Sequence, residues 1–115
     1  MWIVKIGGSW INNPSLSNLI KNLQRLSNKD NIIIVNGGGI FSDSVRLVYE
    51  NKRMSEKTGN YIALKATELF SHLLKEIDKN ICLVDDIESL RFSNKMLKIW
   101  LPSMILKNDS TFIKN

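Results

Sequence analysis

The sequence predicts a single α/β domain, in which short buried strands and helices alternate around a parallel sheet. Two apolar runs, at residues 2–6 and 31–35, each end abruptly in glycine and are followed by a stretch with helical spacing. The whole order (strand, helix, strand, helix, helix, strand, helix, strand) is typical of parallel sheets with right-handed crossovers. The 115 residues suffice for one ordinary domain.

The first half of the chain holds two strands and two helices. Residues 2–6 and 31–35 are expected to be buried strands, and the second is continuously apolar, as in a sheet covered on both faces. A helix is expected to start after Pro14, with Ser15 or Ser17 as its cap. Its core-facing positions are Leu16, Leu19, Ile20, Leu23 and Leu26. Ser42 and Asp43 are expected to cap the second helix.

The second half predicts the remaining elements. The polar residues 51–60, which include Gly59, are expected to form a loop or a frayed helix start. The longest helix is expected over residues 61–78, from Tyr61 at its start to Asp78 at its end. The elements after it are a strand at 81–84, a short helix at 87–92 and an apolar run at 96–101 that Pro102 ends.

Composition narrows the class of protein. Hydrophobic residues make up 43% and charged residues 23%, which is a globular composition. The net charge is +5, but lysine and arginine are scattered from Lys5 to Lys114 without a block. We therefore expect a solvated basic surface that favours anionic ligands, and no nucleic-acid interface.

Single residues exclude several kinds of site. Cys82 is the only cysteine, so no intrachain disulfide can form, and His72 is the only histidine, so no two-histidine metal site can exist. No apolar run approaches the roughly 20 residues of a membrane span, and no secretory signal is evident. A cytoplasmic protein is the expectation.

The two glycine turns suggest a phosphate site. Glycines at the carboxyl end of a strand let backbone N–H groups approach a phosphate, and the next helix N-terminus adds positive charge. Both turns should lie on one edge of the sheet. Neither is a P-loop or a dinucleotide fingerprint. Lys5, inside the first strand, either neutralises charge on a transferred phosphoryl group or sits at a sheet edge and extends to water.

These residues resemble the amino acid kinase family, also called the aspartate/glutamate/uridylate kinase family. The motifs are Val-Lys-Ile-Gly-Gly-Ser near the N-terminus and Val-Asn-Gly-Gly-Gly-x-Phe-Ser-Asp-x-Val-Arg, and the resemblance spans nearly all of the chain. Ser55-Glu56 and Trp100-Leu101-Pro102-Ser103-Met104 resemble one branch, that of the small kinases similar to aminomethylfuran-methyl phosphate kinases. In that branch a histidine is usual where this chain has Asn60.

The resemblance implies a three-layer αβα sandwich and an ATP- and Mg²⁺-dependent kinase whose acceptor is an anionic small molecule, a carboxylate or a phosphate. It implies that Lys5 is catalytic and that Gly7, Gly8 and Ser9 hold ATP phosphates. The implied acceptor-binding residues are Gly37, Gly38, Gly39, Asp43 and Arg46. For Arg46 a surface salt bridge is an equal alternative.

The resemblance also implies how the chain is organised. Family members are about twice as long, so residues 1–115 are expected to be the N-terminal, acceptor-binding portion, with the nucleotide-binding C-terminal portion absent. The helix at 61–78 is expected to pack against its mate in a homodimer. The alternative function is a non-catalytic ligand-binding or dimerisation module derived from such a kinase.

Overall fold

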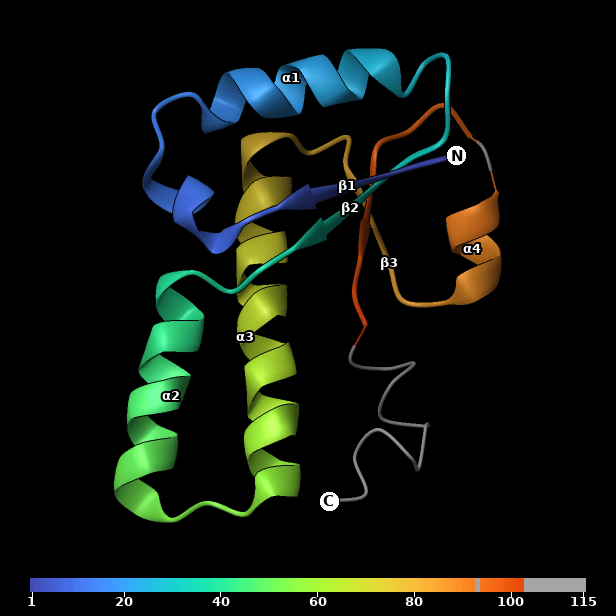
Figure 1. Cartoon of the computed structure of the whole chain (residues 1–115). Coiled ribbons are helices and arrows are strands. Elements are labelled where there is room, and N and C mark those ends of the chain that lie inside the picture. Colours follow the sequence, from blue (N-terminus) through green and yellow to red (C-terminus); the bar gives the residue numbers. More distant parts are fainter. Residues whose placement is uncertain (93, 103–115) are drawn as a thin grey trace.

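The computed structural model describes residues 1–92 and 94–102 and contains one four-stranded sheet (Figure 1). The strands are β1 (Trp2–Ile6), β2 (Ile32–Asn36), β3 (Cys82–Val84) and β4 (Lys98–Trp100). They run parallel in the order β1-β2-β4-β3. The predicted α/β fold with a parallel sheet is therefore confirmed. Ser103 and Met104, the end of the branch motif, lie outside the described residues.

One face of the sheet carries the main hydrophobic core. Val4 and Ile34 are directly paired across β1 and β2, and Ile34 is paired with Ile99 of β4, so these side chains share a face. Two helices cover it, α1 (Leu16–Leu26) and α3 (Glu56–Ile77). The fully buried residues of this core are Ile6, Ile20, Ile34, Phe70, Leu74, Ile81, Leu97 and Ile99. Leu26, expected in the core, is 54% exposed at the end of α1.

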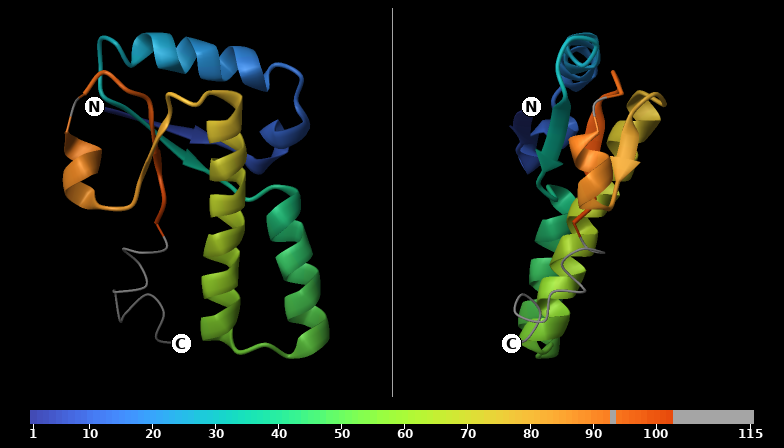
Figure 2. Two further views of the ribbon diagram at one scale, coloured as in Figure 1. Left: turned by 180° about the vertical axis from the view of Figure 1, so that it is seen from behind. Right: turned by 90° about the vertical axis from the view of Figure 1, so that its right-hand side faces the viewer.

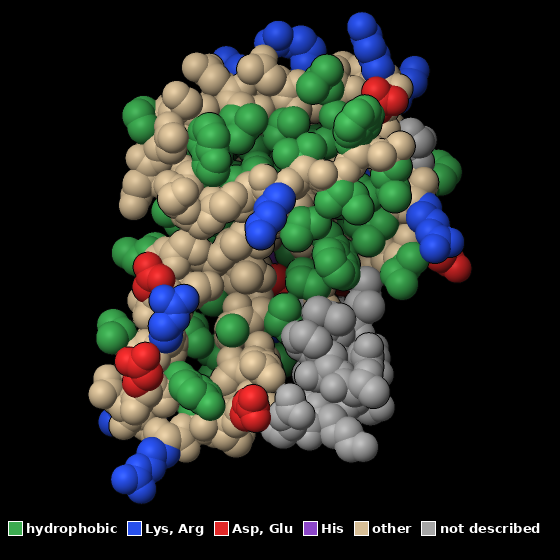
Figure 3. All heavy atoms as spheres, viewed as in Figure 1, with side chains coloured by type: hydrophobic (Ala, Val, Ile, Leu, Met, Phe, Trp, Pro, Cys, Tyr) green, Lys and Arg blue, Asp and Glu red, His purple; other side chains and the backbone are tan. Residues whose placement is uncertain are grey.

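The other face of the sheet is largely bare among the described residues. Only α4 (Ile87–Arg91) lies on it, so the second helical layer of the predicted sandwich is confined to one corner. An apolar cavity of about 270 Å³ lies there, lined by strand residues such as Ile3, Ile33 and Trp100 and by residues of α4. Figure 3 shows the hydrophobic side chains gathered over the strands. The expectation that residues 2–6 are buried is wrong for Trp2 and Ile3, which are 63% and 64% exposed because β1 is an edge strand.

Helices α2 (Ile40–Lys52) and α3 form a hairpin that extends beyond the sheet (Figures 1 and 2). Of the two alternatives for residues 51–60, the loop is wrong, because α2 continues to Lys52 and only a short connection follows it. The helix start is confirmed, because α3 begins at Glu56, five residues before the expected Tyr61. The Ser55 hydroxyl caps α3 by accepting the Thr58 N–H at 3.2 Å. Gly59 lies inside α3 and packs against α2. A side chain would not fit at this position, because a Cβ there would approach the Tyr49 ring to 2.7 Å.

A buried lysine ties α4 to the sheet. Lys98 of β4 is 1% exposed, and its ammonium donates to the Asn31 Oδ1 at 3.0 Å and to the backbone carbonyls of Leu90 and Phe92. Asn31 also donates to the Leu90 carbonyl at 3.0 Å. Burial lowers the pKa of Lys98 below that of an ordinary lysine. Among the described helices, none is long and apolar enough to cross a membrane.

Candidate functional site

The two glycine turns meet at the carboxyl ends of β1 and β2. Gly7 and Gly8 follow β1 and lead into a short 3-10 helix (Gly8–Asn12), whereas Gly37, Gly38 and Gly39 join β2 to α2. The Gly37 N–H donates to the carbonyl of Ile6 at 3.0 Å and so extends the strand pairing into the second turn. The prediction that both turns share one edge of the sheet is confirmed.

Close contact between the two backbones explains most of these glycines. A Cβ on Gly8 would overlap the backbone of Gly39, and a Cβ on Gly39 would lie 2.7 Å from the carbonyl oxygen of Gly8. Gly39 also has a φ of 54°, which side chains rarely adopt. Gly7 differs, because no atom lies within 4 Å of the place where its Cβ would be. Packing within the chain therefore accounts for Gly8 and Gly39 but not for Gly7.

The meeting point offers backbone donors. Gly39 is the residue before α2, so the helix begins without a side-chain cap, and the predicted capping by Ser42 or Asp43 is wrong. The N–H groups of Gly38 and Gly39 have no hydrogen-bond acceptor among the described residues. Such N–H groups, at the positive end of a 13-residue helix, favour an anion such as a phosphate.

A cavity of about 610 Å³ opens over these donors. Both turns and the first residues of α2 line it, so the structure brings six of the predicted site residues together: Gly8, Ser9, Gly38, Gly39, Asp43 and Arg46. Arg46 and Asp43 form an ion pair at 3.5 Å, and both side chains are 69% exposed. Arg46 therefore carries a surface salt bridge and also lines the cavity.

A second cavity of about 420 Å³ adjoins the first between α2 and α3. Ser42 and Arg46 line both cavities. The second one adds Tyr49, Glu56 and Asn60, so it combines an aromatic ring with groups that donate and accept hydrogen bonds. The two cavities together could hold the phosphate and the organic part of one small molecule.

Three predicted site residues lie outside these linings. Gly37 fits its backbone against Gly8, since a Cβ on it would come within 3.2 Å of the Gly8 nitrogen. Gly7 is adjacent to the cavity in sequence only. The Lys5 side chain is exposed on the bare face of the sheet, two residues before Gly7, and has no ion-pair partner among the described residues.

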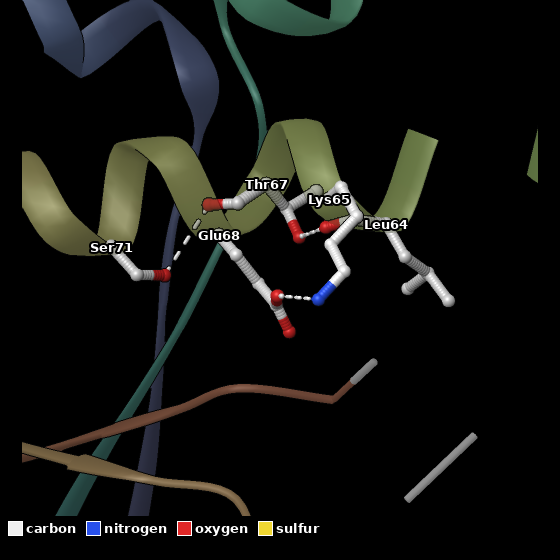
Figure 4. A network of polar contacts seen from close by, with 5 residues as sticks. All are labelled: Leu64, Lys65, Thr67, Glu68 and Ser71. Atoms are coloured by element: carbon white, nitrogen blue, oxygen red, sulfur yellow. Dashed lines mark hydrogen bonds and ion pairs between the residues drawn. The ribbon is translucent and has the colours of Figure 1, made fainter. Parts of the chain in front are cut away.

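Sequence reasoning missed Asn36, the residue that fixes the second turn. Its amide donates to the carbonyls of Gly37 at 3.0 Å and of Thr67 in α3 at 2.9 Å, and its Oδ1 accepts the Ser71 hydroxyl at 2.9 Å. Only its place between a strand and a glycine run could have drawn attention to it. Figure 4 shows the α3 side of this network, where Glu68, which is 8% exposed, pairs with Lys65 at 3.3 Å.

The described residues fit phosphate groups better than they fit a metal ion held by side chains. Gly38, Gly39 and Arg46 line one cavity. The two glycine N–H groups, which have no acceptor among the described residues, and the Arg46 guanidinium are the kinds of donor that phosphate oxygens accept from. Within residues 1–92 and 94–102 no three His, Cys, Asp or Glu side chains gather into a metal site. A Mg²⁺ ion at this site would therefore need oxygens from the phosphates themselves.

Comparison with known proteins identifies the family of this chain. The model of the amino acid kinase family matches residues 1–109. The chain is similar to a [5-(aminomethyl)furan-3-yl]methyl phosphate kinase of Methanocaldococcus jannaschii, with 33% identity over 109 residues, 92% of this chain and 50% of that protein. It also resembles the crystal structure of a uridylate kinase from Archaeoglobus fulgidus, at a TM-score of 0.69 and 24% identity.

That structural match covers 87% of this chain and 50% of the uridylate kinase, and at this identity it shows a shared fold. The chain thus spans about half the length of both proteins. The structure contains a parallel sheet whose two glycine turns pack together at one edge and line a cavity. The family model matches nearly the whole sequence, including both turns. The chain belongs to the amino acid kinase family.

Proposed function

We propose that this protein is, or forms part of, an ATP-dependent kinase that phosphorylates an anionic small molecule. The observation that carries the proposal is the cavity that both glycine turns line, because the N–H groups of Gly38 and Gly39 have no acceptor among the described residues. ATP would supply the γ-phosphoryl group, with Mg²⁺ held by its phosphate oxygens. Family membership supports the use of ATP.

The residues of this chain bind and orient phosphates in this proposal. Gly7, Gly8 and Ser9 hold phosphate oxygens of the nucleotide. Gly8 and Ser9 line the cavity, and Gly7 precedes them with nothing within 4 Å of the place where its Cβ would be. Gly37, Gly38, Gly39 and Arg46 hold the acceptor, while Asp43 orients Arg46 through their ion pair. Lys5 lies on the strand that leads into the first turn, and its exposed side chain neutralises charge on the transferred group.

A phosphate monoester is the acceptor class that we favour over a carboxylate. The name of the Methanocaldococcus jannaschii relative says that it phosphorylates a small organic phosphate. In this chain the cavity between α2 and α3 adjoins the donor site and could hold the organic part of such a molecule, with Tyr49 and Asn60 in contact with it.

Transfer of labelled phosphate from ATP to [5-(aminomethyl)furan-3-yl]methyl phosphate tests the proposal. Replacing Lys5 by Met should lower kcat about 10²- to 10³-fold with KM changed only a few-fold, because its charge matters most in the transition state. Lys21→Met, at an exposed position of α1, is the matched control and should leave kcat unchanged. An unchanged kcat in Lys5→Met would remove Lys5 from the mechanism.

A non-catalytic binding module is the second candidate function. It is favoured by the position of Lys5, whose side chain is not part of the lining of the cavity that both glycine turns build. Both functions predict that the amide resonances of Gly38 and Gly39 shift when ATP or pyrophosphate is added, whereas only a kinase produces turnover. Binding without turnover would select the module, and the absence of both would contradict the phosphate site itself.

The resemblance-based homodimer through residues 61–78 stays a prediction. Three apolar side chains on α3 favour it, since Leu69, Leu73 and Ile77 recur every four residues and are 52%, 38% and 38% exposed. Light scattering coupled to size exclusion should then give twice the monomer mass, and Leu73→Lys should return the monomer.

A further inference from the structure

The second glycine turn needs hydrogen bonds to fix the directions of its backbone groups. Gly37, Gly38 and Gly39 are consecutive, and glycine has access to more backbone conformations than any other residue. An N–H group binds an anion best when its direction is already fixed before the anion arrives. The contacts that hold each peptide of this turn therefore bear on how well it binds phosphate.

Backbone groups hold two of these peptides. The Gly37 N–H donates to the carbonyl of Ile6 at 3.0 Å, and the Gly38 carbonyl accepts the Phe41 N–H at 3.1 Å. The first bond continues the pairing of β1 with β2, and the second belongs to the first turn of α2. The peptide before Gly37 and the peptide after Gly38 are thus held without the help of any side chain.

A side chain holds the peptide between them, which joins Gly37 to Gly38. Its carbonyl oxygen accepts the Asn36 amide at 3.0 Å, and no backbone N–H of the described residues donates to it. The same amide donates to the Thr67 carbonyl at 2.9 Å, and the Asn36 Oδ1 accepts the hydroxyl of Ser71, which is 1% exposed. Thr67 and Ser71 lie one turn apart on α3 (Figure 4), so the helix holds Asn36 in one orientation.

We propose that Asn36 is a positioning residue of the phosphate site, which acts by fixing the direction of the Gly38 N–H. The peptide is trans and planar, so its C=O and N–H groups are directed oppositely. Because the Gly37 carbonyl is directed toward the Asn36 amide, the Gly38 N–H is directed away from it. Gly38 lines the cavity, and its N–H has no acceptor among the described residues. The inference rests on the proposed function, since it gives Asn36 a part in binding phosphate.

Loss of the Asn36 amide should affect the two backbone donors differently. In Asn36→Ala the Gly37–Gly38 peptide loses its side-chain contact, and the glycines on both sides of it allow it to rotate. The Gly39 N–H belongs to the next peptide, whose carbonyl remains bonded to Phe41. The Gly38 N–H therefore loses its fixed direction, whereas the Gly39 N–H keeps its own.

Titration of the isotope-labelled protein with pyrophosphate, followed through the amide resonances of Gly38 and Gly39, measures this difference. Both resonances should shift in the wild type. In Asn36→Ala the dissociation constant should rise at least tenfold, because one of two donors to a charged group is lost. At saturation the Gly39 resonance should still shift, and the Gly38 resonance should shift much less than in the wild type.

Two control variants separate positioning from stability. Ser71→Ala removes a contact of Asn36 but leaves both amide donations, so the dissociation constant should change less than threefold. Ser55→Ala removes the cap of α3 and destabilises the protein away from the turn, so the dissociation constant should stay the same. Circular dichroism checks that every variant is folded at the temperature of the titration.

Several outcomes would overturn the role of Asn36. Wild-type affinity in Asn36→Ala, an undiminished Gly38 shift in that variant, or an equal loss of affinity in Ser55→Ala would each do so while leaving the proposed function intact. If pyrophosphate shifts neither glycine resonance in the wild type, the phosphate site of the proposed function fails, and the role of Asn36 fails with it.

The wild type allows a second measurement, which does not depend on the folding of a variant. The side-chain amide of Asn36 makes two hydrogen bonds, so its protons should exchange with solvent more slowly than those of Asn22, an exposed asparagine of α1. Exchange as fast as in Asn22 would show that Asn36 does not hold the Gly37 carbonyl and would overturn the proposal.

Discussion

Alanine at position 8 or at position 7 should change stability in opposite directions, although the two glycines are neighbours. A Cβ on Gly8 overlaps the nitrogen and Cα of Gly39, which are backbone atoms and cannot rotate away. Overpacking of this kind typically costs 1–3 kcal/mol, and we expect about 3 kcal/mol because the second turn is held in place by Asn36.

Gly7 offers the matched comparison. Its φ of −66° and ψ of 154° suit alanine, and nothing lies within 4 Å of the added methyl group. Alanine restricts the unfolded chain more than glycine does, so Gly7→Ala should stabilise the protein by about 0.5 kcal/mol. The two variants should therefore differ by roughly 3.5 kcal/mol in the free energy of unfolding.

Urea unfolding followed by circular dichroism measures this difference. With an m-value of about 1.5 kcal/mol/M, the midpoints of the two variants should be about 2 M apart, with the wild type between them and nearer to Gly7→Ala. Equal midpoints, or a Gly8→Ala variant as stable as the wild type, would show that the two turns do not pack backbone to backbone.

Three further predictions concern the polar contacts. Asn36→Ala removes three hydrogen bonds and should lower the free energy of unfolding, measured in urea, by about 2–3 kcal/mol. Asn22→Ala, at an exposed position of α1, is the control and should leave it unchanged. The lowered pKa of Lys98 means that the unfolded chain binds more protons just below the usual lysine pKa. Wild-type stability should therefore rise with pH there relative to Lys98→Met, and a parallel pH dependence would refute this. Ser55→Ala removes the cap of α3 and should lower the free energy of unfolding by about 1 kcal/mol. Ser55→Asp keeps a capping oxygen and should be nearly as stable as the wild type.

The parts of the fold that the sequence predicts are those governed by local patterns. Apolar runs that stop in glycine located β1 and β2, and parallel pairing then required both turns to share an edge. Contacts between distant residues were beyond such patterns. Gly59 indicates a loop in the sequence, but in the structure it lies inside α3, where the Tyr49 ring of α2 leaves no room for a Cβ. Trp2 is typical of a buried strand, and the sequence does not show that its strand lies at the edge of the sheet.

In the candidate site, too, the sequence predicts the residues that belong to a local pattern and not those whose partners are distant. The glycines were found because their spacing after a strand is visible in the sequence. Asn36 was missed because its partners, Thr67 and Ser71, are 31 and 35 residues away in α3. Lys98 lies within a run that is otherwise mainly apolar, and only the fold brings Asn31, 67 residues away, to its ammonium.

The way in which Lys98 holds α4 has a consequence for how this corner of the molecule can evolve. The ammonium contacts the main-chain oxygens of Leu90 and Phe92, and Asn31 contacts the same oxygen of Leu90, so neither depends on which side chains α4 carries. The surface of α4 can therefore diverge between homologues while its seat on the sheet is kept. Variation should be tolerated along the outer side of the helix and resisted at positions 31 and 98.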